Sequence, residues 1–131
     1  MSYKIRIVNL KPINPDTLVI TKSNYGALYD VQLPLDYIPE TPWQDIFVEE
    51  MRIPRSATFM PKIKVDISSI IVSTPPDQIK EAIEIVKKIV DATNERVKEH
   101  NIDVEIEWEK RKKQKAKEEE IIKRMREQLK Q

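Results

Sequence analysis

The sequence predicts an α+β protein in which a mostly antiparallel, five- or six-stranded sheet packs on one long amphipathic helix. Three observations carry this prediction. Several short segments alternate apolar and polar residues, as strands do. Apolar residues in 76–100 recur every three or four positions, as in a helix, and the last segment is charged and lacks proline and glycine. A short second helix and a charged C-terminal helix complete the expected fold.

The length of the chain, 131 residues, suits one domain with one core. The pattern of charge and hydrophobicity changes near residue 109. We therefore expect a globular α+β domain over 1–109 and a charged helical C-terminal extension over 110–131.

Three regions have β character. Residues 3–10 alternate and are expected to form the first strand. Residues 17–33 predict a hairpin, because the only glycine of the chain, Gly26, lies between two strand-like runs, where a turn favours it. Residues 57–73 predict further strands. The last of these is expected to be buried on both faces, because residues 70–72 are all apolar.

A short helix is expected over 42–52. Thr41 and Gln44 have the spacing of a capping box, in which each residue satisfies a free backbone donor at the start of the helix. Apolar side chains then recur every four positions, so that one face of the helix is suited to the core. These side chains are Trp43, Phe47 and Met51.

Residues 76–100 have the strongest helical pattern, with charges between the apolar positions. Thr74 is expected to cap this helix and Asn101 to end it. Residues 102–109 alternate strictly between apolar and acidic side chains, which favours a strand. Glutamate is nevertheless a good helix former, so the alternative is one helix that continues almost unbroken to the C-terminus.

Charge is distributed unevenly along a chain that is nearly neutral overall. Residues 109–131 contain ten basic and five acidic residues, whereas 1–108 contain 13 basic and 17 acidic ones. Six cations fall within 110–117, and three glutamates follow at once. Such a cluster can contact the phosphates of a nucleic acid, although a solvated helix face is the simpler interpretation. The candidate contact residues are Lys110, Arg111, Lys112, Lys113, Lys115 and Lys117.

A narrow apolar stripe lies near the end of the chain, in an otherwise charged segment. Isolated helices of this length are marginal in water. The stripe is therefore expected to fold back on the body, pair with a copy of itself or bind a partner, unless it belongs to a frayed end. It indicates assembly, and we name it the assembly stripe: Ile121, Ile122, Met125 and Leu129.

Motifs of known chemistry are scarce. One glycine in 131 residues argues against a P-loop, a dinucleotide fingerprint and a nucleophile elbow. His100, the only histidine, is expected at a helix C-terminus, where a cation complements the helix dipole. Asp30, Asp36 and Asp66 could form a carboxylate site, but a solvent-facing role is the simpler interpretation. We assign no catalytic, cofactor-binding or metal-binding residue.

Six aromatic residues invite comparison with the stacking platforms that bind single-stranded nucleic acid. Several of them fit faces that are expected to be core, and their neighbours are mostly acidic, so core packing is favoured. They are Tyr25, Tyr29, Tyr37, Trp43, Phe47 and Phe59.

The expected location is the cytoplasm. No run approaches the about 20 apolar residues that span a bilayer, so no membrane association is expected. The N-terminus has no apolar signal-peptide core. The absence of cysteine fits a reducing compartment. Abundant Lys, Glu and Ile with scarce glycine fit a heat-adapted protein or an AT-rich genome equally well.

The leading hypothesis is a non-enzymatic intracellular interaction module. Its C-terminal helix would mediate self-association, giving a homo-oligomer, or dock on a protein partner. The first alternative is a nucleic-acid-binding accessory protein that uses the basic cluster at 110–117. The second is a small enzyme with a carboxylate site that is not visible in the sequence. None of the three calls for a cofactor.

Overall fold

The computed structural model describes residues 3–57 and 59–130 and confirms the α+β class. Its contacts divide the chain into two compact units. Ile5–Lys98 form one, which we call the sheet unit. Glu99–Gln131 form the other together with the N-terminal residues up to Lys4, and we call it the helical unit. The predicted division into 1–109 and 110–131 stays a prediction.

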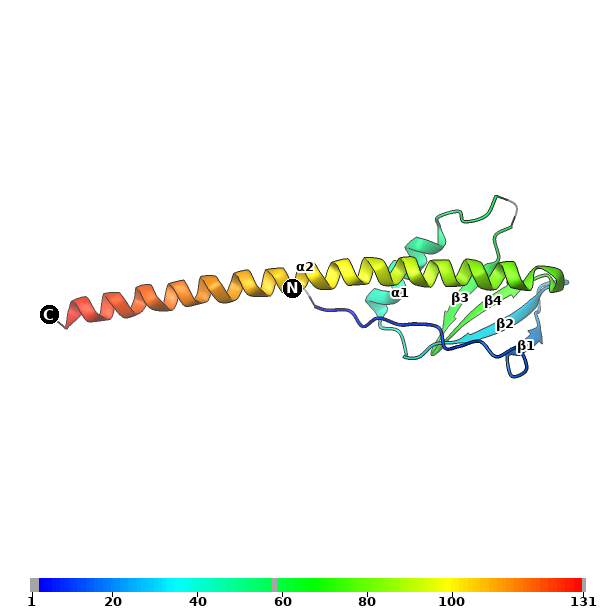
Figure 1. The fold of residues 1–131 in the computed structure, drawn as a ribbon, viewed down its shortest axis with the longest axis horizontal. Helices are drawn as coiled ribbons and strands as arrows, with labels where there is room; N and C mark the ends of the chain where they lie inside the picture. Colours follow the sequence, from blue (N-terminus) through cyan, green and yellow to red (C-terminus); the bar gives the residue numbers. More distant parts are fainter. Residues whose placement is uncertain (1–2, 58, 131) are drawn as a thin grey trace. The chain divides into compact units, whose positions relative to one another are not determined.

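Four antiparallel strands form the sheet (Figure 1). The hairpin predicted over 17–33 is confirmed, with Gly26 at a φ of 59° in its turn. The predicted count of five or six strands is wrong for the residues that the structure describes. In the spatial order β1-β2-β4-β3, the strands are β1 (Val19–Lys22), β2 (Tyr29–Pro34), β4 (Ser69–Thr74) and β3 (Lys62–Asp66).

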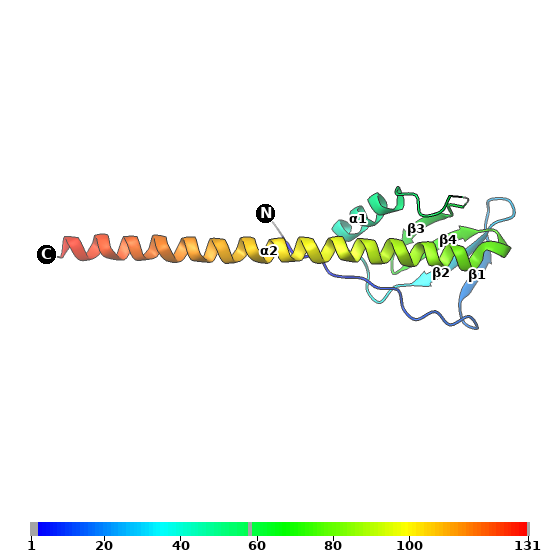
Figure 2. The same cartoon turned by 45° about the horizontal axis from the view of Figure 1, so that its top comes forward.

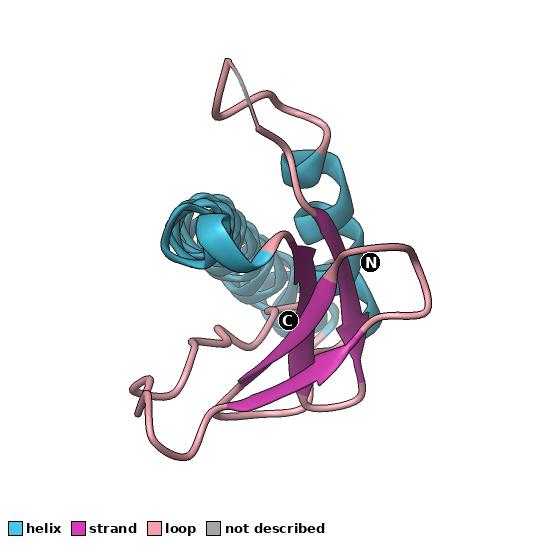
Figure 3. Ribbon diagram, turned by 90° about the vertical axis from the view of Figure 1, so that its right-hand side faces the viewer, coloured by secondary structure: helices cyan, strands magenta, loops and turns pink. Residues whose placement is uncertain are grey.

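One face of the sheet holds the core. The register pairs Val31 with Val72 and Leu33 with Ile70, so these four fully buried side chains share a face. Residues of α1 (Thr41–Met51) and of the first part of α2 (Ile79–Leu129) belong to the same buried cluster. Figures 2 and 3 show both helices beside the strands. Helices thus cover the core face of the sheet.

The outer face of the sheet is open. Ile71 and Ser73 alternate with the buried residues of β4 and are only half-buried, and Gln32, opposite Ile71, is exposed. The prediction that residues 70–72 lie in a strand buried on both faces is therefore wrong. The continuous apolar run misleads because Ile71 is an apolar residue on the solvent side of an antiparallel sheet.

Residues 3–10, predicted as a strand, are extended, but within the described residues they pair with no strand beyond an isolated bridge at Leu10. Two backbone hydrogen bonds flank this bridge, from the amide of Lys11 to the carbonyl oxygen of Pro34 and from the amide of Asp36 to that of Asn9. Before it, side chains replace the ladder. The backbone amide of Arg6, for example, donates to Glu40 Oε1 at 2.9 Å. Because side-chain acceptors satisfy backbone donors here, alternating hydrophobicity does not lead to a strand.

A buried asparagine on α2 forms hydrogen bonds with the backbone of this extended N-terminal segment. Asn94 is 5% exposed, and its Nδ2 donates to the carbonyl oxygen of Val8 at 2.8 Å. Its Oδ1 accepts from Trp43 Nε1 at 2.9 Å and from the amide of Val8 at 3.4 Å. One side chain therefore joins the N-terminal segment, α1 and α2, and provides partners for polar groups that the core would otherwise leave unsatisfied.

Helix α1 begins at Thr41, but the predicted capping box does not form. Glu40 is the N-cap residue, no side chain caps the helix, and Gln44 Nε2 donates to the backbone that precedes it. Proline suits the first turn of a helix for two reasons. Its fixed φ is helical, and the N–H that it lacks would have no acceptor within the helix at this position. The predicted apolar face is confirmed: Trp43 and Phe47 are fully buried and stack with 5.2 Å between ring centroids.

Helix α2 is longer than predicted. A 3-10 turn, Pro76–Gln78, precedes it, and the helix then continues for 51 residues to Leu129. Thr74 does not act as the cap: Pro75 is the N-cap residue of the 3-10 turn, and Thr74 Oγ1 donates to the carbonyl oxygen of Pro75. Asn101 does not end the helix either, because the backbone remains helical on both sides of it.

Residues 102–109 are helical, so the favoured strand is wrong and the alternative of one continuous helix is confirmed. Helical spacing decides which side chains are covered. Val104 is 1% exposed, whereas Ile102 and Ile106 are 60% and 48% exposed. The intervening glutamates are good helix formers, and a helix already begun at Ile79 needs no new nucleation. Propensity and continuity therefore outweigh the alternation.

Candidate assembly surface on helix α2

The assembly stripe lies in the last turns of α2, and all four of its side chains are exposed. Ile121 is 56% exposed, Ile122 50%, Met125 60% and Leu129 86%. At 100° per residue, the four side chains fall within a sector of about 100° around the helix axis. They form one apolar face, and the described residues leave it open to solvent.

The basic cluster at 110–117 is exposed throughout and surrounds the helix. Arg111 forms an ion pair with Glu107, and Lys112 approaches Glu109 at 3.9 Å. The remaining four cations form no ion pair with any described residue. Exposed pairs of this kind contribute little to stability. The six cations are therefore solvated and distributed around α2, and no single face of the helix is basic.

Two N-terminal residues lie along the beginning of the helical unit. The carbonyl oxygen of Tyr3 is 2.8 Å from His100 Nε2, and Lys4 Nζ is 3.1 Å from Glu105 Oε2 and 5.5 Å from the ring centroid of Trp108. The prediction that His100 lies at a helix C-terminus is wrong, because α2 continues past it and its ring bonds to a backbone carbonyl. Side chains of the helical unit are thus contacted as far as Trp108.

The strand-borne carboxylates do not form a site. Asp30 pairs with Ser73 and Asp66 with Ser69, so about 13 Å of strand separates the two acids on the sheet. Asp30 Oδ1 accepts from Ser73 Oγ at 2.6 Å, and Asp36 accepts from a backbone amide of the N-terminal segment. The cavity of about 230 Å³ beside Asp30 is lined by no second carboxylate among the described residues.

The aromatic residues do not form a common platform. Trp43 and Phe47 are core residues, as predicted. Tyr25 and Tyr37 are 65% and 46% exposed, so core packing is wrong for them, and each has a basic side chain over its ring. They lie in different loops, one in the β1–β2 turn and one after β2. The half-buried members are Tyr29 and Phe59.

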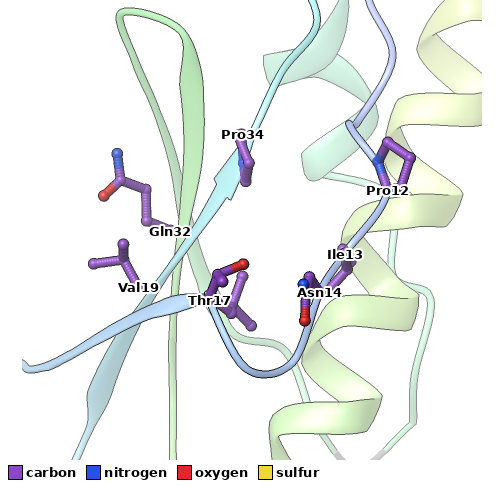
Figure 4. A pocket seen from close by; sticks show the side chains of 8 residues that line it. Pro12, Ile13, Asn14, Thr17, Val19, Gln32 and Pro34 are labelled. Atoms are coloured by element: carbon purple, nitrogen blue, oxygen red, sulfur yellow. The ribbon is translucent and has the colours of Figure 1, made fainter.

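A further cavity lies between the loop that precedes β1 and the adjacent strands (Figure 4). Pro12, Asn14, Thr17 and Gln32 are among its lining residues, and none of the lining residues carries a titratable group. Its volume of about 180 Å³ lies below the roughly 300–1,000 Å³ of typical ligand pockets. Neither size nor chemistry marks it as a catalytic site.

Within residues 3–57 and 59–130, no group of three or more metal-ligating side chains is placed to hold a metal ion. Over the same residues, no helix combines the length and the hydrophobicity needed to cross a membrane. Comparison of the chain with family models, curated proteins and solved structures finds no match. On the described surface, the assembly stripe is the clearest feature.

Proposed function

We propose that the protein is a non-enzymatic interaction module of the cytoplasm. The helical unit acts by contact, through self-association or docking on a protein partner, and the sheet unit serves as its folded scaffold. The single observation that carries this proposal is the exposure of all four side chains of the assembly stripe. The lack of cysteine is consistent with the reducing compartment that we assign.

The energetics favour a contact role. Covering a half-exposed Ile, Met or Leu stabilises a complex by on the order of 1 kcal/mol for each side chain. The stripe is held in a helix that continues from a stretch with buried residues, such as Ile89. Little further conformational entropy is then lost on binding, because the binding segment is already ordered. A preformed apolar face on a charged helix is the mode by which helices enter grooves or pair with one another.

Analytical ultracentrifugation of the full chain over about 1 µM to 1 mM tests the proposal. The test variant replaces the assembly stripe with glutamine, a good helix former: Ile121→Gln, Ile122→Gln, Met125→Gln and Leu129→Gln. The matched control carries Ile102→Gln and Ile106→Gln, which remove exposed apolar side chains from the same helix. We expect the natural chain and the control to associate with rising concentration and the stripe variant to remain a monomer.

If the natural chain stays monomeric throughout and sediments like the stripe variant, self-association is contradicted. If the stripe variant associates as strongly as the natural chain, the stripe has no role in assembly. Circular dichroism of each variant verifies that α2 is retained, so that a loss of association cannot be confused with a loss of helix.

A second candidate function, nucleic-acid binding, is favoured by the four cations of the basic cluster that form no ion pair with a described residue. Phosphate contacts release counterions, so affinity would fall steeply with salt. The test is filter binding or fluorescence anisotropy with a mixed-sequence oligonucleotide. The test variant carries Lys112→Glu, Lys113→Glu, Lys115→Glu and Lys117→Glu. The control carries the same charge reversal at four exposed lysines in the first part of α2: Lys80→Glu, Lys87→Glu, Lys88→Glu and Lys98→Glu.

This candidate predicts that the first variant loses most of the affinity while the control keeps it. Binding that is equally weak in both variants, or that does not change between about 50 and 200 mM salt, contradicts it.

A further inference from the structure

One face of the helical unit continues the assembly stripe towards the start of that unit. Counting back from Met125 in steps of three and four gives a row that ends at Trp108. Such a row drifts by only about 20° per seven residues, which is the geometry of a coiled-coil seam. Its middle is charged and its ends are apolar or aromatic. The row consists of Trp108, Arg111, Lys115, Glu118, Ile122 and Met125.

The charges of the helical unit come in blocks of alternating sign. Residues 103–109 contain four acids and no base, and 110–117 contain six bases and no acid. Residues 118–120 are all glutamate, and 123–126 contain three bases. If the helix is reversed about a point between Ala116 and Lys117, the acidic block 103–109 faces 124–130, which contains three bases and one acid, and the glutamates 118–120 face 113–115, which contain two lysines. This complementarity of the helix with its own reverse identifies the kind of partner it fits.

We propose that two copies of this chain pair in antiparallel orientation through residues 108–125, with the twofold axis between Ala116 and Lys117. The proposal rests on the proposed function and specifies it: the partner is a second copy, and its direction and register are fixed. Three kinds of layer repeat about the axis. Trp108 meets Met125 of the second copy, Arg111 meets Ile122, and Lys115 meets Glu118.

Each layer has a chemical basis. Met125 brings a thioether to the indole of Trp108, which is a favourable sulfur–aromatic contact. The aliphatic stem of Arg111 covers Ile122 while its guanidinium reaches solvent. Lys115 and Glu118 form an ion pair next to the axis, and Lys112 lies beside Glu119 of the second copy at the flanking positions that set partner choice and orientation.

Other arrangements place like charges together. In a parallel pair, Arg111, Lys115 and Glu118 each face their own copy across the seam, which is repulsive at three successive layers. An antiparallel pair shifted by one heptad brings Lys112 beside Arg126 and Glu119 beside itself. A shift in the other direction brings Arg111 against Lys115. The register about Ala116 and Lys117 is thus the one that avoids these clashes of charge.

The contacts of the N-terminal residues limit the paired stretch at one end. Val104 is 1% exposed and offers no surface to a second copy, and the adjacent Glu105 is already ion-paired with Lys4. Trp108 is 39% exposed and lies at this limit. The pairing therefore begins at Trp108, and Leu129 lies beyond the last complete layer.

A charge exchange tests the orientation. Lys112→Glu turns two symmetry-related attractions with Glu119 into repulsions, and we expect the dimer dissociation constant to rise about tenfold. Adding Glu119→Lys restores attraction in the antiparallel pair and should return the constant to near its natural value. In a parallel pair, position 112 faces Glu107, so Glu119→Lys would give no rescue. Failure of the rescue overturns the proposed orientation.

Distances between spin labels test the register independently. The chain has no cysteine, so single labels can be attached to Ala116→Cys or to Glu127→Cys in the full chain. An antiparallel pair keeps the two labels at 116 close and separates those at 127 by about 32 Å along the axis, at 1.5 Å per residue. Equal short distances at both positions overturn the antiparallel arrangement but leave self-association standing. A long distance at 116 overturns the proposed register and also leaves self-association standing, whereas the absence of any dimer overturns self-association together with the proposed pairing.

Discussion

Helix α2 contains two stretches that each have an apolar face but whose surroundings are opposite. Over 79–98, most of its apolar side chains are buried in the core, and Ile89 is fully covered. Over 109–129, its apolar side chains are exposed by half or more, Ile122 among them. One continuous helix thus has a buried apolar face and a bare one. Helical periodicity therefore predicts where an apolar face lies, but whether that face is already covered depends on the rest of the chain.

The largest expected effect comes from one matched pair of substitutions on α2. Ile89→Ala should lower the free energy of unfolding by about 3 kcal/mol, because it removes buried apolar atoms and leaves a cavity. Ile122→Ala should change it by less than about 0.5 kcal/mol, because the side chain is exposed in the single chain. Urea unfolding at low micromolar concentration, where any pairing is weakest, measures both. An equal loss in the two variants would show that Ile122 is as well covered in the single chain as Ile89.

The next effect concerns the polar contacts of the buried stretch. Asn94→Ala should lower the free energy of unfolding by about 2 kcal/mol, because it leaves the indole N–H of Trp43 and the backbone of Val8 without their partners in the core. The control Gln114→Ala removes an exposed amide from the other stretch and should be close to neutral. Thermal unfolding followed by circular dichroism compares the two. A neutral Asn94→Ala would show that the buried network contributes little.

A smaller effect tests the intrinsic stability of the bare stretch. Ala116→Gly should reduce the local stability of the helix by about 1 kcal/mol, which is the difference in helix propensity between the two residues. Hydrogen exchange of the amides around 116 should accelerate about fivefold, while that of the amides over 79–98 stays the same. If exchange over 79–98 also accelerates, the two stretches unfold as one cooperative unit.

The smallest effect concerns the N-terminal contact. Lys4→Ala removes the ion pair with Glu105 and the cation over Trp108, both exposed, and should cost no more than about 1 kcal/mol. Exchange of the amides over 100–108 should show the change, because Lys4 lies along that part of the helix. A loss well beyond this range would mean that the N-terminal residues hold the helical unit together.

The sequence predicted the elements whose residues interact with near neighbours. Trp43 and Phe47 lie on the face that their spacing indicates, and the hairpin turns at Gly26. Residues 3–10 were mispredicted because their partners, Glu40 and Asn94, are distant in the sequence. A local pattern contains no information about such acceptors, so alternation alone could not show that the strand would not form.

The error at 102–109 had a different cause. Strict alternation indicated a strand, but a helix already formed from Ile79 and the propensity of glutamate decided the outcome. This error also hid part of the candidate site. Only when 102–109 is helical does Trp108 fall on the same seam as Ile122 and Met125. The assembly stripe could be found from its spacing, whereas its alignment with Trp108 required the structure.

Hydrogen exchange of the full chain at two protein concentrations, about 5 µM and 500 µM, tests most directly whether a second copy covers the bare face of α2. We predict that amides over 108–125 become more protected at the higher concentration, while amides over 79–98, whose apolar face is already covered within one chain, do not change. Protection over 108–125 that is the same at both concentrations would show that no second copy covers this face.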